Sequence, residues 1–273
     1  MHNPYIEFCR FKNPPVVYVV AEVLISPVMK MADYVANIQD RLRVNGFPRF
    51  QQQSNQTFEI NPVSQKVTVG EQSFWEFIST DNKWGVILTA SSIAISTSQH
   101  RDFALLSEKL LNVLNIVNEE VRVSTSERLG LRYVDLIREK ADCDLISFVA
   151  PGLHGVPDDE IGLSNARHGW HIIGSTTAGQ LVVKATQFND GTYFPPDMRP
   201  TSLKFEESIK PLTEEKILLL DFDHSCTESG VFDVDSIIRK MSALHDGIWK
   251  AFLATVSEQA IKLWEPETEE VVE

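Results

Sequence analysis

Apolar and polar positions along this chain predict several strands and three amphipathic helices. Residues 16–25, VVYVVAEVLI, are apolar on both faces and rich in β-branched side chains, which predicts a central strand. Ser26 as N-cap and Pro27 as first helical residue then predict a helix that ends at Gly46. The apolar stripe of this helix comprises Met31, Tyr34, Val35, Ile38 and Leu42.

Short apolar runs separated by turn residues predict an antiparallel meander over residues 51–98. Its strands are expected near residues 67–69, 74–79, 85–89 and 92–97. A second amphipathic helix is expected over about residues 101–118, and residues 128–137, RLGLRYVDLI, alternate as a strand.

The second half of the chain begins with loop residues and then becomes regular. Residues 168–174 and 180–188 predict a hairpin, and residues 215–223, EKILLLDFD, predict another very apolar strand. Residues 232–264 form the longest periodic helix, which at 1.5 Å per residue would be roughly 50 Å long. We expect this helix either to bridge both halves or to break near Gly247.

Strands mostly follow strands, so the predicted fold class is α+β, with mainly antiparallel sheets, helices packed on one face and a long C-terminal helix. The predicted units are an N-terminal half, residues 1–138, and a C-terminal half, residues 139–264, which ends in the long helix. Each half combines strands with a helix, which is compatible with an ancient duplication, although no sequence self-similarity demonstrates one. Residues 265–273 are expected to be a solvated acidic tail.

Composition narrows the function classes. The net charge of −13 argues against an extensive nucleic-acid surface, which would need a basic stripe. The sequence has no apolar run long enough for a membrane helix, and its first residues lack the apolar core of a secretion signal. Cys9, Cys143 and Cys226 are widely spaced and predict no disulfide framework. These features predict a cytoplasmic protein, with no membrane partner.

Four stretches of the chain resemble one protein family. They are KNPPVVYVVAEVLIS, ERLGLRYVDLI, ILLLDFDHS and LHDGIWKAFLATVSEQAIKLWEP, in that order. Together they resemble a sporadically distributed prokaryotic family of similar length with a central R-x-G-L-R-Y strand and no assigned activity. Asp135 stands where that family often has Asn. The resemblance implies a bacterial cytoplasmic setting and accessory genes such as phage-defence or toxin–antitoxin islands, and carries over no catalytic residues.

One candidate site involves charged residues on the apolar strands. Arg128, Gly130 and Arg132 share one face of their predicted strand, and Glu22 lies within the other apolar strand. Because buried charges must be paired, Glu22 is expected to pair with Arg132 or Arg128 once the two strands lie together, or else Asp221 and Asp223 neutralise these arginines. The alternative is an anion-binding pocket built on the two guanidinium groups, with Gly130 leaving room for a ligand.

A second candidate site lies toward the end of the chain. Asp221, Asp223 and His224 could supply metal ligands, with His245 joining from the long helix. Against this, Asp223 and His224 face opposite sides of a strand, and His245 falls on the apolar face of the helix, as a core-edge histidine would.

No nucleophile elbow, phosphate-binding glycine loop or metal-binding motif occurs in the sequence, and no cofactor is expected. The first functional hypothesis is therefore a non-enzymatic interaction or sensing protein that binds a protein partner or a small anionic ligand, the latter in a cavity between sheet and long helix. The alternative is a metal-dependent hydrolase or nuclease-like enzyme built on Asp221, Asp223, His224 and His245. A homodimer is compatible with either hypothesis.

Overall fold

The fold is α+β, as predicted, and is built on one large antiparallel sheet. The computed structural model describes residues 8–60, 67–139, 143–156, 160–163, 166–198, 202–210 and 215–268. Within this part of the chain, ten strands form the sheet in the order β3-β4-β5-β6-β2-β7-β10-β9-β8, with the short β11 pairing at one end of β7. The strands are β2 (Val16–Ile25), β3 (Arg49–Ile60), β4 (Val67–Ile78), β5 (Trp84–Thr89), β6 (Ser92–Thr97), β7 (Thr125–Arg138), β8 (Gly169–Ser175), β9 (Gln180–Phe188), β10 (Ile217–Cys226) and β11 (Gly230–Val231).

The centre of the sheet consists of the three most apolar strands. β7 lies between β2 and β10 and pairs with both along most of its length, which confirms that the two apolar strands of the first half are neighbours. β10 comes from the second half of the sequence, so both halves contribute to one continuous sheet. The division into two units at residue 138 stays a prediction.

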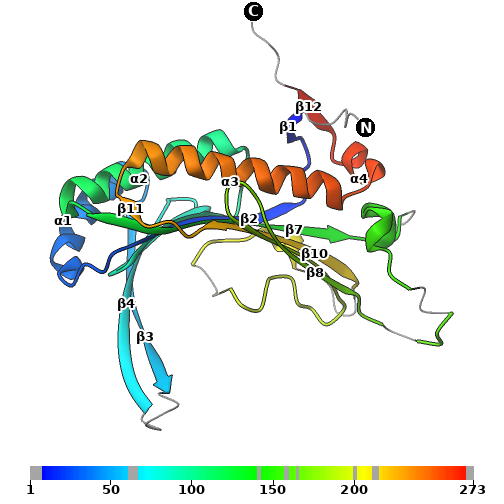
Figure 1. The fold of residues 1–273 in the computed structure, drawn as a ribbon, viewed down its shortest axis with the longest axis horizontal. Helices are drawn as coiled ribbons and strands as arrows, with labels where there is room; N and C mark the ends of the chain where they lie inside the picture. The colour runs from blue at the N-terminus through cyan, green and yellow to red at the C-terminus, as the bar shows by residue number, and fades with distance from the viewer. Residues whose placement is uncertain are drawn as a thin grey trace, which may run out of the picture.

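Three helices cover one face of the sheet, as Figure 1 shows: α1 (Met31–Val44), α2 (Phe103–Val121) and α3 (Val234–Thr255). Their buried stripes pack with the alternate residues of the central strands, among them Val19, Leu131 and Phe222, in the main core. We call this the helix face. On the opposite face, a smaller core forms between strand residues such as Val134 and the strap, residues 189–198 and 202–210, drawn in yellow below the sheet in Figure 1.

The first helix starts later than the sequence predicts. It begins at Met31, and its N-cap is Lys30 rather than Ser26. The segment before it is held by the neighbouring strands, because the backbone N–H of Ser26 donates to Thr125 and that of Val28 donates to Ala90. Tertiary hydrogen bonds therefore override the local capping signal at Ser26 and Pro27. The apolar stripe was predicted correctly, since Met31, Val35, Ile38 and Leu42 are all buried.

The hairpin of β3 and β4 differs most from the predicted meander. β3 was missed because its sequence, RFQQQSNQTFEI, lacks a sustained alternation of apolar and polar residues. The segments predicted at 67–69 and 74–79 belong to one strand, β4. The hairpin extends away from the rest of the sheet (Figure 1).

The long C-terminal helix breaks at a different place from the one predicted. α3 ends at Thr255, and α4 (Glu258–Leu263) starts after Ser257, whose side chain accepts a hydrogen bond from the N–H of Ala260. Gly247 lies inside unbroken α3, where it allows close packing. A Cβ at this position would lie 2.4 Å from Cε1 of His224 on β10. Glycine is therefore required for the approach of α3 to the sheet rather than for a bend.

The two ends of the described chain pair with each other. β1 (Phe8–Phe11) and β12 (Pro266–Thr268) form a two-stranded sheet beside α4, next to one end of the main sheet (Figure 1). Ion pairs join Arg10 to Glu267 and Lys12 to Glu265. The start of the predicted acidic tail is thus paired with β1, and residues 269–273 lie outside the described residues.

The short 3-10 helices are η2 (Leu145–Phe148), η3 (Pro151–Leu153) and η4 (Glu207–Ile209). Among the described helices, none combines the length and apolar character needed to span a bilayer.

The contact between Gly247 and His224 gives a first testable prediction. On an exposed helix, Gly→Ala stabilises by about 1 kcal/mol. Gly247→Ala is expected instead to destabilise the protein by about 1–3 kcal/mol, because the added methyl group overlaps the His224 ring. Urea denaturation measures the effect. In a His224→Ala background the same substitution should lose its cost, and an equal cost in both backgrounds would show that the ring contact is not its cause.

Candidate ligand site

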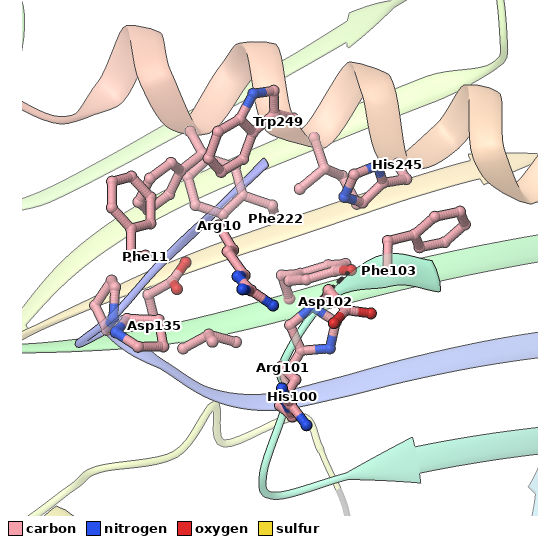
Figure 2. A pocket seen from close by; sticks show the side chains of 16 residues that line it. Arg10, Phe11, His100, Arg101, Asp102, Phe103, Asp135, Phe222, His245 and Trp249 are labelled. Atoms are coloured by element: carbon pink, nitrogen blue, oxygen red, sulfur yellow. Dashed lines mark hydrogen bonds between the residues drawn. The ribbon is translucent and has the colours of Figure 1, made fainter. Parts of the chain in front are cut away.

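A small, largely apolar cavity lies at the end of the sheet where β2 begins and β7 ends. It has a volume of about 70 Å³ and lies between the helix face of β7 and β10, helix α3, strand β1 and the segment before α2. We call it the inner cavity. Figure 2 shows side chains from these elements converging on it. Its walls are formed by Arg10, Phe11, Pro14, Pro15, Val16, His100, Arg101, Asp102, Phe103, Tyr133, Asp135, Phe222, His245, Ile248, Trp249 and Phe252.

Aromatic rings form one side of the inner cavity. Phe11 on β1 packs against Trp249 and Phe252 of α3, with ring centroids 5.7 and 5.9 Å apart. Phe252 also contacts Phe222 of β10 at 6.0 Å. This side of the cavity therefore depends on β1, which the pairing with β12 holds in place.

Asp135 is a buried acid in the wall of the inner cavity. The residue is only 4% exposed, and its side chain makes no hydrogen bond or ion pair with any residue that the structure describes. Burial, and then the nearby negative charge of Asp221, raise the pKa of the Asp135 carboxyl to about 8. At neutral pH the carboxyl group is therefore mainly protonated and uncharged.

Two histidines line the same cavity, and both are neutral at pH 7. The Nε2 atom of His100 lies 3.4 Å from the hydroxyl oxygen of Tyr133, whereas its buried Nδ1 atom has no hydrogen-bond partner among the described residues. Burial, followed by repulsion from His245, lowers the pKa of His100 to about 4. His245 stacks on Phe103 with centroids 4.2 Å apart, and burial lowers its pKa as well.

A wider, open hollow adjoins the inner cavity. This outer hollow has a volume of about 710 Å³ and shares with the inner cavity a wall that includes Arg10, His100 and Arg101. Lys12 and Arg138 also line it, so four cationic side chains face two carboxylates, Glu206 and Glu267.

Arg138 and Arg101, two of these four cations, have side-chain groups without a partner. Arg138 donates from Nη1 to Glu215, but its buried Nη2 atom has no hydrogen-bond partner in the described part of the chain. Arg101 forms no ion pair with a described residue. At the same end of the sheet, the pairing of β2 with β7 shifts register between Val16 and Tyr18, an irregularity that often accompanies binding sites.

The first sequence-predicted site lies on the opposite face of the sheet. The nearest side-chain atoms of Glu22 and Arg128 are 3.5 Å apart, and Asp223 lies 3.9 Å from the same guanidinium. Burial raises the pKa of Glu22. A Cβ on Gly130 would lie 3.0 Å from Nη1 of Arg128, so the space above Gly130 is filled by the Arg128 side chain.

Arg132 pairs with Asp221, one of the carboxylates expected as its partner, and also with Asp197 of the strap. Its guanidinium donates two hydrogen bonds of 2.7 Å to Asp221 and two of 3.0 Å to Asp197 of the strap. The carboxylate that accompanies Arg132 is thus Asp221 rather than Glu22. With Lys184 near Asp221, the cluster holds three cations and four carboxylates: Arg128, Arg132 and Lys184 against Glu22, Asp197, Asp221 and Asp223. Its charge balance does not favour an anion, and its role as a ligand site stays a prediction.

The residues proposed for a metal site lie on both faces of the sheet. Asp221 and Asp223 are on the strap side, whereas His224 points to the helix face and is fully buried. Its Nδ1 atom lies 2.8 Å from the carbonyl oxygen of Leu244, and its Nε2 atom lies 2.8 Å from the hydroxyl of Thr176. His245 lies at the inner cavity. Over the described ranges, no three His, Cys, Asp or Glu side chains are grouped so that they could hold a metal.

Sequence reasoning missed the residues that meet at the sheet end. His100 and Arg101 precede α2 without forming a motif, and Arg138 ends β7. Asp135 gave the one usable signal, because it shares a strand face with the apolar Leu131 and Tyr133, and a lone acid on a core face requires an explanation.

No protein-family model and no curated protein matches this chain. The resemblance through R-x-G-L-R-Y therefore stays a prediction.

The ion pair of Arg132 gives a second testable prediction. Arg132→Ala is expected to destabilise the protein by about 3–5 kcal/mol, because it leaves the buried Asp221 carboxylate without its main counter-charge. Adding Asp221→Asn should restore much of that loss in denaturant melts. Glu22→Gln is the matched control and should not restore it. Recovery with Glu22→Gln but not with Asp221→Asn would contradict the pairing.

Asp135 gives a third prediction, on the pH dependence of stability. Because its pKa is higher in the folded than in the unfolded chain, its ionisation favours unfolding as pH rises from about 4 to about 8. Asp135→Asn should remove this contribution, so the variant should gain a few kcal/mol over the wild type at pH 9 and little at pH 4. Urea melts across this range measure the difference. A constant difference at every pH would mean that Asp135 does not titrate in this window.

Proposed function

We propose that the protein is a non-enzymatic sensing protein that binds a small anionic ligand in the outer hollow. One observation carries the proposal. Two buried polar atoms, Nδ1 of His100 and Nη2 of Arg138, have no hydrogen-bond partner among the described residues, and both residues line this hollow. Buried polar groups in folded proteins are nearly always hydrogen-bonded, and an unmet group costs about 1–3 kcal/mol. Both atoms lie just beneath the surface, so a ligand would reach them when neighbouring side chains move aside. Its acceptor oxygens would then satisfy the arginine, and the histidine could donate or accept.

The charge around the hollow supports an anion. The chain as a whole carries −13, yet four of the six charged side chains that line the outer hollow are cationic. Arg101 is the cation without an ion-pair partner in the described part of the chain. A planar guanidinium suits carboxylate and phosphate oxygens, which it can bind through two parallel hydrogen bonds.

The inner cavity would hold the less polar end of the ligand. Its volume of about 70 Å³ corresponds to a group of a few heavy atoms, since a water molecule occupies about 30 Å³ in the liquid. Aromatic walls favour an apolar group, and the protonated carboxyl of Asp135 can donate one hydrogen bond to it. The ligand would therefore be a small organic acid or phosphate with a compact uncharged end.

The paired chain ends offer a way to report binding. Arg10 and Lys12 line the hollow and already pair with Glu267 and Glu265. A bound anion would compete with these carboxylates and weaken the pairing of β1 with β12. A protein partner that recognises the paired β1 and β12 could detect this change, which would suit a bacterial accessory system such as the phage-defence or toxin–antitoxin setting implied by the resemblance.

The alternative enzyme hypothesis receives less support. The hydrolase hypothesis requires four side chains to act together: Asp221, Asp223, His224 and His245. These side chains are divided between the two faces of the sheet. Both ring nitrogens of His224 already have partners within the fold.

Titration with defined anions tests the proposal. Benzoate and inorganic phosphate are added separately to the purified chain, and binding is followed by calorimetry and by the midpoint of thermal unfolding. At least one anion is expected to stabilise the folded protein, by about 2.7 kcal/mol when its concentration is 100 times its Kd. Arg101→Ala should weaken that binding at least about tenfold, by removing the unpaired guanidinium.

The matched control is Arg239→Ala, which removes an exposed arginine of α3 that does not line the hollow. This variant should bind like the wild type. Failure of both anions to bind, or equal loss of affinity in the two variants, would overturn the proposal.

A further inference from the structure

The edge strand β8 is unusual in its composition. Its sequence, GWHIIGS, contains no Asp, Glu, Lys, Arg or Pro, although the chain carries a net charge of −13. Ile172 and Ile173 are 57% and 58% exposed and point to opposite faces. β8 also pairs with β9 without any register shift, so no bulge twists its open edge away. Natural edge strands usually carry a charge, a proline or a bulge, which discourages pairing with another chain.

The other edge of the sheet has such protection. β3 contains Arg49 and Glu59 in its sequence. The lack of charge is therefore particular to the β8 edge. In the strand order, β8 is separated by β9 and β10 from β7, the strand that reaches the outer hollow.

The hydrogen bonds of the hairpin show which groups of β8 point outward. The N–H of Thr176 donates to Gly179, and the N–H of Gln187 donates to the carbonyl of His168, so the even-numbered positions bond toward β9. In an antiparallel ladder the odd positions then direct both backbone groups to the open side. These are Gly169, His171, Ile173 and Ser175. None of them is paired by a further strand in the described part of the chain.

We propose that β8 is a self-association surface, on which β8 of a second copy pairs antiparallel about a two-fold axis at Ile172. Ile172 is the central residue of the strand, so this register pairs all of β8. His171 then lies opposite Ile173 of the second copy, and Gly169 lies opposite Ser175, which allows about eight backbone hydrogen bonds. The axis is perpendicular to the sheet, so the helices of both copies lie on the same side.

The side chains favour a second copy over an unrelated strand. Trp170 falls opposite Gly174 of the second copy, where a large ring can cover the space left by glycine. The two Ile172 side chains meet at the axis on the helix face, and each would be buried by the other. No like charges are brought together, whereas most other surfaces of so acidic a chain would repel their own copies.

A proline variant tests the proposal without disturbing the monomer. The N–H of Ile173 points outward, so Ile173→Pro removes no hydrogen bond to β9 but blocks the ladder to a second copy. By analytical ultracentrifugation, the wild type is expected to be a dimer at micromolar concentration and Ile173→Pro a monomer whose circular dichroism spectrum matches that of the wild type. A monomeric wild type, or an Ile173→Pro variant that still dimerises, would overturn the proposal.

A cysteine variant tests the register. Residues facing each other across the axis form a non-hydrogen-bonded pair with Cα atoms about 4.5 Å apart, which suits a disulfide. Ile172→Cys should therefore form a covalent dimer under mild oxidation. Val231→Cys, at the highly exposed β11 position, is the control and should crosslink no more than the wild type. Equal crosslinking in the two variants would refute the two-fold register at Ile172.

Discussion

Burial of the central strands on both faces is the constraint on which the rest of the structure depends. β2, β7 and β10 lie between three helices on one side and, over part of their length, the strap on the other. A charged side chain on such a strand must find a counter-charge, reach solvent or lose its charge. Arg132 has found counter-charges, since it donates four hydrogen bonds to Asp221 and Asp197. Asp135 instead loses its charge, since burial keeps its carboxyl mainly protonated at neutral pH.

The same constraint marks the end of the sheet as the place where ligand binding is expected. In the described part of the chain, the two fully buried side-chain atoms without a hydrogen-bond partner belong to His100 and Arg138, which line one hollow. β1 closes the adjoining cavity and is held by the C-terminal β12. Binding at this position would therefore act on β1 and β12, which is how a site inside the fold could influence a partner outside it.

The sequence predicted the parts of the fold that burial dictates. The strand at Val16–Ile25, the pairing of β2 with β7 and the stripe of α1 follow from apolar periodicity, which a shared core imposes. β3 was missed because its hairpin leaves the core, and the helix start at Ser26 was misplaced because strand contacts hold that segment. Gly247 suggested a break, whereas its role is contact with a histidine more than twenty residues away in sequence. The candidate site was missed because its residues come from separate elements and share no motif.

The protonation state of Asp135 is the most direct test of this account, because it links the burial of the central strands to the chemistry of the cavity. The side-chain carboxyl carbon of Asp135 can be followed by NMR in uniformly ¹³C-labelled protein as the pH is changed, with Asp135→Asn used to assign the signal. The account predicts a protonated carboxyl at pH 7 and a titration midpoint near 8. A midpoint near 4, the ordinary value for an exposed aspartate, would contradict it.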